Sequence, residues 1–372
     1  MIIGIPKEVK NHEYRVGLTP ASVRELASLG HQIIVESEAG SGVGFTNQAY
    51  QEAGATIAQT ANEVFAKAEL IVKVKEPQPQ ECKLLRPDQV LFTYLHLAPD
   101  PEQAAGLIKS GCIAIAYETV TDARGGLPLL APMSEVAGRM SIQVGASMLE
   151  KGHGGAGVLL GGVPGVEPAK VVILGGGVVG INAAKIAVGM GADVTVVDKN
   201  PYRLNELDWQ FSGRLKTVFP TFESVEDLVI KADLVVGAVL VVGAAAPRLV
   251  TRNMIKKMKP GSVLVDVAID QGGCFETSRP TTHAHPSYVV DHVIHYCVTN
   301  MPGAVARTST LALNNATLPF VLALCQKGYR QALLEDVHLL NGLNVHKGHI
   351  TYHAVAQALN LEYKNPKDLL VA

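Results

Sequence analysis

The chain has 372 residues, of which 48% are hydrophobic and 18% charged, and its formal net charge at pH 7 is -2. Two domains are the default expectation at this length, because a single hydrophobic core rarely grows so large. The near-neutral balance lacks both the basic footprint of a nucleic-acid-binding protein and an acidic tail. We therefore expect no nucleic-acid partner.

The cysteines and the apolar segments indicate the compartment. Five scattered cysteines form no C-x-x-C pair, which favours free thiols in a reducing environment. The first ten residues, MIIGIPKEVK, lack the basic segment and apolar core of a signal peptide. The longest apolar stretch, Leu234–Ala246, is shorter than the ~18 to 20 residues of a membrane-spanning helix. These features predict a cytoplasmic protein without a membrane partner.

The first third of the chain alternates short apolar runs with helix signals. Thr19 is a predicted N-cap, Pro20 occupies the first helical position and Gly30 ends the helix. Such alternation predicts a parallel sheet covered by helices. Strands are expected at Ile2–Ile5, Gln32–Val35, Leu70–Val74, Val90–Leu95 and Ile113–Tyr117.

A long amphipathic segment follows the first predicted sheet. Ser134 is expected to cap a helix over Glu135–Glu150, and the glycine-rich run Gly152–Gly165 comes next. We expect the chain to cross into a second domain in this region.

The segment Val171–Asp198 carries a glycine fingerprint in an informative context. A buried strand is expected at Val171–Leu174, a helix at Ile181–Met190 and another strand at Asp193–Val197. Between the first strand and the helix, three glycines follow the G-x-G-x-x-G spacing: Gly175, Gly177 and Gly180. They suit a tight turn, close approach of a pyrophosphate and close helix packing. The fingerprint alone also fits any tight strand-to-helix turn, but its flanking elements favour a dinucleotide site.

The acidic residue that ends this segment predicts which dinucleotide binds. A carboxylate at Asp198 would accept hydrogen bonds from a ribose 2′-hydroxyl and repel a 2′-phosphate, so NAD is favoured over NADP. The nearby cations Lys199 and Arg203 weaken this preference slightly.

The pattern beyond the fingerprint completes a second sheet. Further strands are expected at Thr217–Phe219, Leu234–Leu240, Val263–Ala268 and Val293–Val298, and helix from about Ala304 to Gln326. The C-terminal tail is expected to hold helices without a sheet of its own and to return to the first domain. The predicted fold is α/β, with two doubly wound Rossmann-like domains, parallel sheets and a substrate cleft between them. The domains are residues 1–130 plus 306–372, for substrate and catalysis, and 131–305, for NAD.

Three titratable residues follow predicted strands, where ligands bind in open α/β sheets. Lys75 could hold a carboxylate or polarise a carbonyl, His96 could exchange a proton, and Asp270 could orient a water or an amine. Taken singly, each is equally well explained as a solvated strand end or a loop residue.

Two further clusters allow alternative interpretations. Glu8, Glu13 and Arg15 follow the first strand, where the arginine suits either a small carboxylate or a surface ion pair. The H-x-H sequence within Thr281–Pro286 lacks further ligands at metal-binding spacing, so we predict a hydrophilic loop and no metal. Nucleophilic catalysis is not predicted, since there is no G-x-S-x-G and no cysteine with an obvious helper base.

Two long motifs show a family resemblance. GIPKEVKNHEYRVGLTP, from Gly4 to Pro20, and GGAGVLLGGVPGV followed by VVILGGGVVG resemble the signatures of the alanine dehydrogenase and pyridine nucleotide transhydrogenase family. The resemblance covers essentially the whole chain. It implies reversible, NAD-dependent oxidative deamination of L-alanine to pyruvate, ammonium and NADH.

The resemblance also implies roles for individual residues. Arg15 and Lys75 would bind the substrate, His96 would be the general acid/base, and Asp270 would assist the water and amine steps. Pro220 stands where a serine often contacts adenosine. Positions that match the cofactor lining are Ser134, Gly175, Gly177, Val178, Val179, Gly180, Asp198, Arg203, Val239, Leu240, Val267, Ala268, Ile269, Asp270, Arg279, Val298, Thr299, Asn300 and Met301.

Other functions remain open at this point. The alternatives are the NAD(H)-binding alpha subunit of a proton-translocating transhydrogenase, a catalytically silent NAD-binding regulator and a saccharopine-type dehydrogenase. Lys75, His96 and Asp270 favour the amino-acid dehydrogenase, because a subunit that passes hydride between nucleotides needs no amino-acid pocket. The family's soluble dehydrogenases are typically hexamers, so a homo-oligomer is expected.

Overall fold

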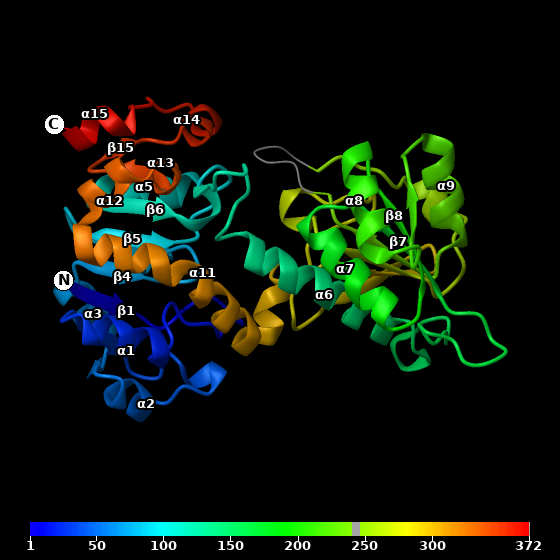
Figure 1. The fold of residues 1–372 in the computed structure, drawn as a ribbon, viewed down its shortest axis with the longest axis horizontal. Helices are drawn as coiled ribbons and strands as arrows, with labels where there is room; N and C mark the ends of the chain where they lie inside the picture. Colours follow the sequence, from blue (N-terminus) through cyan, green and yellow to red (C-terminus); the bar gives the residue numbers. More distant parts are fainter. Residues whose placement is uncertain (240–245, 372) are drawn as a thin grey trace. The chain divides into compact units, whose positions relative to one another are not determined.

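The computed structural model describes residues 1–239 and 246–371. The chain divides into two compact units (Figure 1). The first unit comprises Met1–Met133 and Val305–Ala372, and the second comprises Ser134–Ala304. The first unit is thus built from both ends of the chain.

The first unit contains an eight-stranded sheet with the order β15-β14-β6-β5-β4-β1-β2-β3. Strands β1 to β6 are parallel, whereas β14 runs antiparallel to β6 and β15 antiparallel to β14. The strand bounds are β1 Ile2–Ile5, β2 Gln32–Glu36, β3 Thr56–Ala58, β4 Leu70–Val72, β5 Val90–Thr93, β6 Ile113–Ala116, β14 Leu343–His346 and β15 His349–Ile350.

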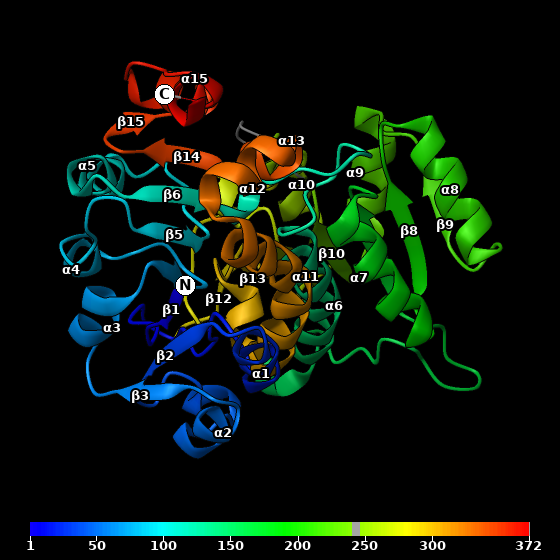
Figure 2. The ribbon, with the colours of Figure 1, turned by 60° about the vertical axis from the view of Figure 1, so that its left-hand side comes forward.

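Helices cover both faces of this sheet. Figure 2 shows α3, α4 and α5 on one face and α1, α11 and α12 on the other. The predicted signals of α1 are confirmed, since the Thr19 side chain caps it, Pro20 begins it and Gly30 follows it at φ +84°. The helix bounds are α1 Pro20–Ser28, α2 Asn47–Glu52, α3 Ala61–Lys67, α4 Pro79–Cys82, α5 Pro101–Ser110, α11 Ala306–Lys327, α12 Tyr329–Glu335, α13 Val337–Leu340, α14 His353–Leu359 and α15 Pro366–Val371.

The C-terminal tail differs from the prediction in one respect. It returns to the first unit, but it also adds β14 and β15 to the sheet, so the expectation of helices alone was wrong. The strands are short, and the turn between them places Lys347 and Gly348 at positive φ. A segment of this length has no periodicity that separates strand from loop.

The second unit contains a seven-stranded sheet with the order β12-β13-β11-β10-β7-β8-β9. Six strands are parallel, and the edge strand β12, which the sequence did not predict, runs antiparallel to β13. The fold class of two doubly wound α/β domains is confirmed, with sheets that are mixed and not wholly parallel. The bounds are β7 Lys170–Leu174, β8 Asp193–Val197, β9 Lys216–Val218, β10 Leu234–Gly237, β11 Val263–Asp266, β12 Ser287–Val290 and β13 Val293–Tyr296.

Helices α9 and α10 share a buried core with β7, β10 and β11 on one face of the second sheet. Helix α6 packs closely on α7 at Gly138. A Cβ at this position would lie 2.2 Å from the Val179 carbonyl oxygen, so only glycine allows the two helices to approach this closely. Figure 1 shows these two helices side by side. The bounds are α6 Ala131–Met148, α7 Val178–Gly189, α8 Pro201–Phe211, α9 Phe222–Lys231 and α10 Arg252–Lys256.

Helix α6 corrects one expectation, because it begins at Ala131, so Ser134 lies inside the helix and does not cap it. The first division between the units falls after Met133, within this helix, three residues beyond the predicted boundary after residue 130. The first three residues of α6 therefore belong to the first unit and the rest to the second.

The segment Met301–Lys327, which includes α11, is long and apolar enough to cross a membrane by composition alone. One such helix is weak evidence for a span, because core helices of soluble proteins pass the same test. Within α11, Asn314 accepts hydrogen bonds from the Thr19 amide at 2.9 Å and the Ser22 hydroxyl at 2.7 Å. These bonds fasten α11 to the start of α1.

Candidate functional site

Each sheet has a point where the strand order reverses, and such points bind ligands at the carboxyl ends of the strands. In the first unit the order reverses between β1 and β4, and in the second between β7 and β10. Most of the predicted site residues follow strands. The register between neighbouring strands therefore determines which of these residues lie at the same edge of a sheet.

The register of the second sheet places several predicted cofactor residues at one edge. Leu174 pairs with Gly237, and Gly237 pairs with Asp266. The residues that follow these three strand ends therefore lie at the same edge, and they include Gly175, Val239 and Val267.

The three fingerprint glycines have distinct surroundings. Gly175 has φ +105°, and a Cβ there would lie 2.7 Å from the Ala238 carbonyl oxygen. At Gly180 a Cβ would lie 1.8 Å from the Gly175 carbonyl oxygen, so only glycine lets α7 approach β7. Gly177 is exposed, caps α7 and has no described atom within 4 Å of such a Cβ. The open backbone at Gly177 fits the close approach of a pyrophosphate to the helix N-terminus.

Asp198 and Arg203 hold the glycine turn between them. The Gly176 amide donates to Asp198 Oδ2 at 2.7 Å, and Arg203 Nε donates to the Gly176 carbonyl oxygen at 2.5 Å. The second Asp198 oxygen accepts from the Asn200 amide at 2.8 Å. An ionised carboxylate has about four acceptor positions, so Asp198 retains capacity for a ribose hydroxyl.

Asp266 is a buried residue that the sequence reasoning missed. Its carboxylate accepts from the Ala268 amide at 3.1 Å, the Cys274 amide at 2.8 Å and the Ser278 hydroxyl at 2.5 Å. Burial raises the pKa of this carboxyl. Asp266 thus folds the loop that carries Asp270, which is exposed on the 3₁₀ turn Ile269–Gln271. Its position at the end of the apolar run VLVD was the available signal.

The remaining cofactor candidates lie on several elements of the second unit or at its ends. Ser134 is on α6, Val178 and Val179 open α7, and the turn from Val298 to Met301 follows β13. Arg279 precedes Thr281, which forms an isolated parallel bridge with Val298. Leu240 lies outside the described residues.

The first sheet gathers its own predicted residues by register. Val72 pairs with Phe92, and Phe92 with Ile115, so β4, β5 and β6 end at a common edge. Lys75 and His96 follow the first two of these strands.

A buried charge cluster lies beneath Lys75. Lys73 Nζ is 3.1 Å from Glu8 Oε2 and 2.7 Å from Glu81 Oε1. Burial lowers the pKa of Lys73, but the two carboxylates outweigh it and the pKa is raised. Glu8 Oε1 also accepts from the Val74 amide at 2.7 Å and from the Lys75 amide at 3.4 Å. β4 ends at Val72 and not at Val74 as predicted, although the Lys73 amide still donates to the Phe92 carbonyl oxygen at 3.2 Å.

Arg15 is buried and paired within its own loop. Its Nε and Nη2 atoms donate to the two carboxylate oxygens of Glu13 at 2.7 and 2.6 Å, and Nη1 lies 3.1 Å from Met133 Sδ. Burial lowers the pKa of Arg15, but the hydrogen bonds and charge of Glu13 raise it by more. The pKa of Arg15 is therefore raised overall. The surface ion pair considered from the sequence is therefore a buried one, 2% exposed at the arginine.

His96 is held from two sides. Its amide donates to Glu118 Oε1 at 2.6 Å, and its Nδ1 is 3.8 Å from the same oxygen. The imidazole stacks on Tyr94, with the ring centroids 5.8 Å apart and the planes at 5°. His96 has φ +50°, an uncommon left-handed conformation for this residue that often marks functional sites. The side chain itself is 47% exposed, which leaves it accessible to a substrate.

Tyr94 contacts the strand end before Lys75 as well as His96. Its amide donates to the Val74 carbonyl oxygen at 3.3 Å, next to Lys75, and its ring stacks on His96. Burial raises the pKa of Tyr94, and the charge of Arg15 opposes this rise. Neither Tyr94 nor Glu118 was predicted, because nothing in the sequence marks their pairing with residues elsewhere.

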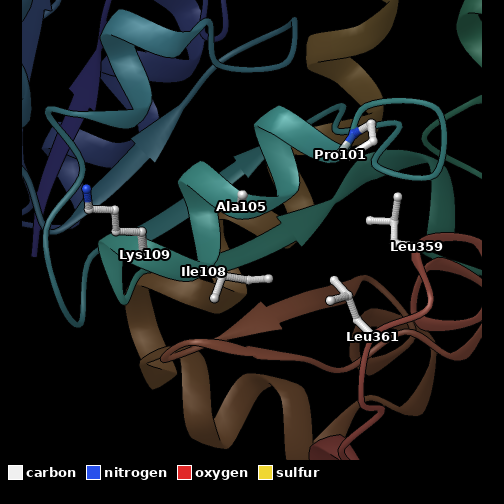
Figure 3. Close-up of a pocket in the computed structure, with 6 residues that line it drawn as sticks. All are labelled: Pro101, Ala105, Ile108, Lys109, Leu359 and Leu361. Atoms are coloured by element: carbon white, nitrogen blue, oxygen red, sulfur yellow. The ribbon is translucent and has the colours of Figure 1, made fainter.

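A hollow of about 280 Å³ lies elsewhere in the first unit (Figure 3). Four of its residues belong to α5, and the other two are leucines at the end of α14 and just after it. The lining is apolar apart from one lysine, so it offers no acid/base pair. The lining residues are Pro101, Ala105, Ile108, Lys109, Leu359 and Leu361.

The two sheets and their edges define a class of protein. The second unit has a fingerprint turn that fits a dinucleotide, and the first presents the buried cations Lys73 and Arg15 and the half-buried Lys75 at its own switch point. This is the architecture of a two-domain, nucleotide-binding α/β enzyme.

Comparison with known proteins gives the family. The model described as "Alanine dehydrogenase/PNT, N-terminal domain" matches residues 4–137, and the corresponding C-terminal domain matches residues 141–353. This chain belongs to the alanine dehydrogenase/PNT family.

Three relatives illustrate the range of similarity. An alanine dehydrogenase of Halomonas elongata is 60% identical over 370 residues, which cover 100% of each chain. A solved L-alanine dehydrogenase is 52% identical with a TM-score of 0.94, covering 97% of this chain and 99% of its own. A solved transhydrogenase from Sinorhizobium meliloti is 27% identical with a TM-score of 0.80, covering 95% of this chain and 100% of its own.

Proposed function

We propose that this protein is an NAD-dependent L-alanine dehydrogenase. It converts L-alanine, NAD⁺ and water reversibly to pyruvate, ammonium, NADH and a proton. The observation that supports the proposal most is that Arg15, Lys75 and His96 lie on the segments that follow β1, β4 and β5, three strands that end at the same edge of the first sheet. Full-length identity of 60% to an alanine dehydrogenase supports the same reaction.

The first unit supplies the groups that handle the amino acid. Lys75 and Arg15 bind the carboxylate and the carbonyl region of the substrate, since both are cations at the carboxyl edge. His96 removes a proton from the amino group in the oxidative direction and returns it in the reductive direction. Glu118 holds the backbone amide of His96, and the Tyr94 ring stacks on the imidazole that makes this exchange.

The second unit supplies the cofactor site. Bound NAD would supply the hydride acceptor for the alanine α-carbon. The glycine turn at Gly175–Gly180 takes the pyrophosphate, and Asp198 takes the ribose hydroxyls. Asp270 orients the water that attacks the imine carbon and the amine that leaves.

A transhydrogenase subunit is the second candidate, because the Sinorhizobium meliloti protein shares the fold at 27% identity. It is less favoured, since the alanine dehydrogenases are about twice as similar in sequence. A silent NAD-binding regulator and a saccharopine-type dehydrogenase have no specific observation in their support. We further propose a cytoplasmic homo-oligomer, with a hexamer expected from the family.

One assay tests the proposal. Purified protein is mixed with NAD and L-alanine at alkaline pH, and NADH formation is followed by absorbance. We expect NADH with alanine. NADH with another amino acid but not with alanine would refute the substrate, and NAD binding without any turnover would favour the transhydrogenase subunit or the regulator.

A further inference from the structure

Arg279 rests on a three-membered stack in the second unit. Its guanidinium carbon lies 4.2 Å from the centroid of the Tyr288 ring, a cation–π distance. The Tyr288 ring also stacks on His295, with the centroids 5.0 Å apart and the planes at 22°. Tyr288 and His295 are directly paired across β12 and β13.

Hydrogen bonds fix each member of the stack. The Tyr288 hydroxyl accepts from the Arg279 amide at 2.9 Å and donates to the Thr277 carbonyl oxygen at 2.9 Å. His295 Nδ1 is 3.0 Å from the Val293 carbonyl oxygen, so Nδ1 carries the proton. The other ring nitrogen then accepts from the Thr277 hydroxyl at 2.7 Å.

Burial favours the same protonation states. Desolvation lowers the pKa of His295 and raises the pKa of Tyr288. The imidazole is therefore neutral and the phenol protonated near neutral pH. A neutral imidazole does not repel the Arg279 cation.

The stack stands next to the ligand edge of the sheet. The Thr281 amide donates to the Cys297 carbonyl oxygen at 2.9 Å, and the Thr299 amide donates to the Thr281 carbonyl oxygen at 3.3 Å. These bonds hold the segment with Arg279 against the end of β13, where the turn from Val298 begins. A cation fixed there attracts a negatively charged dinucleotide.

We propose that Tyr288 is a positioning residue that holds Arg279 in place for NAD. The ring supports the guanidinium, and the hydroxyl fixes the backbone of the same residue. This inference rests on the proposed function, in which Arg279 lines the cofactor site. Without the tyrosine the arginine would keep its charge but lose its preset position, so cofactor binding would weaken.

The test is a double-mutant cycle on the full chain, read as the Kd of NADH from fluorescence titration. Tyr288→Phe keeps the ring and should weaken binding about threefold. Tyr288→Leu removes ring and hydroxyl and should weaken it about tenfold. In the Arg279→Met background neither change should weaken NADH further. The same tenfold loss in that background, or an unchanged Kd in Arg279→Met alone, would overturn the proposal.

Two controls separate the possible failures. Tyr363 also pairs with a histidine, His353, at a centroid distance of 5.4 Å, but it belongs to the first unit. Tyr363→Leu should leave the Kd of NADH unchanged, and an equal loss there would count against the proposal. The Phe variant keeps the core filled, so it remains informative if Tyr288→Leu does not fold. Failure of the proposed function appears separately, as NADH binding without alanine-dependent turnover in the wild type.

Discussion

The two sheets share one strand order but present different groups at their ligand edges. Counted within each unit, β3-β2-β1-β4-β5-β6 and β9-β8-β7-β10-β11-β13 follow the same doubly wound pattern. The second edge offers mainly backbone, through a glycine turn held by Asp198 and Arg203. The first edge offers charged side chains on buried partners, such as Glu13 with Arg15. The fold thus fixes where the loops converge, and the loops decide which groups they present there.

The largest expected effect comes from the side chain at the centre of the first edge. His96→Ala should lower kcat by about 10² to 10⁴ while the Kd of NADH stays unchanged, because the acid/base group is lost and the cofactor edge is intact. Steady-state kinetics and NADH titration measure the two quantities. His349→Ala, at an exposed histidine on β15, is the control. Near-normal activity in His96→Ala would remove this residue from the proposed chemistry.

The next effect concerns the second edge, where substitutions in the glycine turn should weaken NADH binding. Gly180→Ala places a methyl group 1.8 Å from the Gly175 carbonyl oxygen, so it should lower stability by about 1 to 3 kcal/mol and weaken NADH binding. Gly177→Ala meets no described atom within 4 Å, so it should not lower stability. It should still weaken NADH binding, because the added methyl group would stand where the pyrophosphate approaches the start of α7. Thermal melts and NADH titration compare the pair. Equal melting temperatures for the two variants would contradict the packing role of Gly180.

A smaller effect concerns the choice of cofactor. Asp198→Ala should shift the NAD-over-NADP preference by about tenfold, since the repulsion of a 2′-phosphate and a hydrogen bond to the 2′-hydroxyl are both lost. The ratio of kcat/KM for the two cofactors is the measurement. Because Asp198 also holds the Gly176 amide, Asp198→Asn serves as the control that keeps an acceptor. An unchanged ratio in Asp198→Ala would refute the 2′-hydroxyl argument.

The smallest effect tests the support of His96. Glu118→Gln keeps the shape of the side chain but removes its charge, so kcat should fall about fivefold through weaker bonds to the His96 and Leu95 amides. The Kd of NADH should not change. In the His96→Ala background the same substitution should cost nothing more, and a full additional loss there would show that Glu118 acts by another route.

Local signals in the sequence predicted most of the fold. Apolar runs placed β1, β7 and β8, and the Thr19–Pro20 pair placed the start of α1. The edge strands β3 and β15 were not predicted; they have only three and two residues. The edge strand β9 was predicted, although it also has three residues. Helix α6 begins at Ala131, three residues before the cap predicted at Ser134.

The candidate site was predictable where a residue follows a strand, and not where it depends on a distant partner. Lys75, His96 and Asp198 were found from their position alone. Glu118 lies 22 residues from His96, and Glu8 lies 65 from Lys73, so no spacing rule connects them. Partners of this kind are set by tertiary packing. The roles of the site residues themselves remain predictions.

The pairing of β14 with β6 has a consequence for how the protein is made. Ile115 and Leu343 are neighbours in the first sheet, although the whole second unit is synthesised between them. During translation the second unit can fold as soon as it leaves the ribosome, since its sheet is contiguous in sequence. The first unit must wait with an open edge at β6 until the last strands arrive. The nascent protein is therefore exposed to aggregation at that edge longer than at any strand of the second unit.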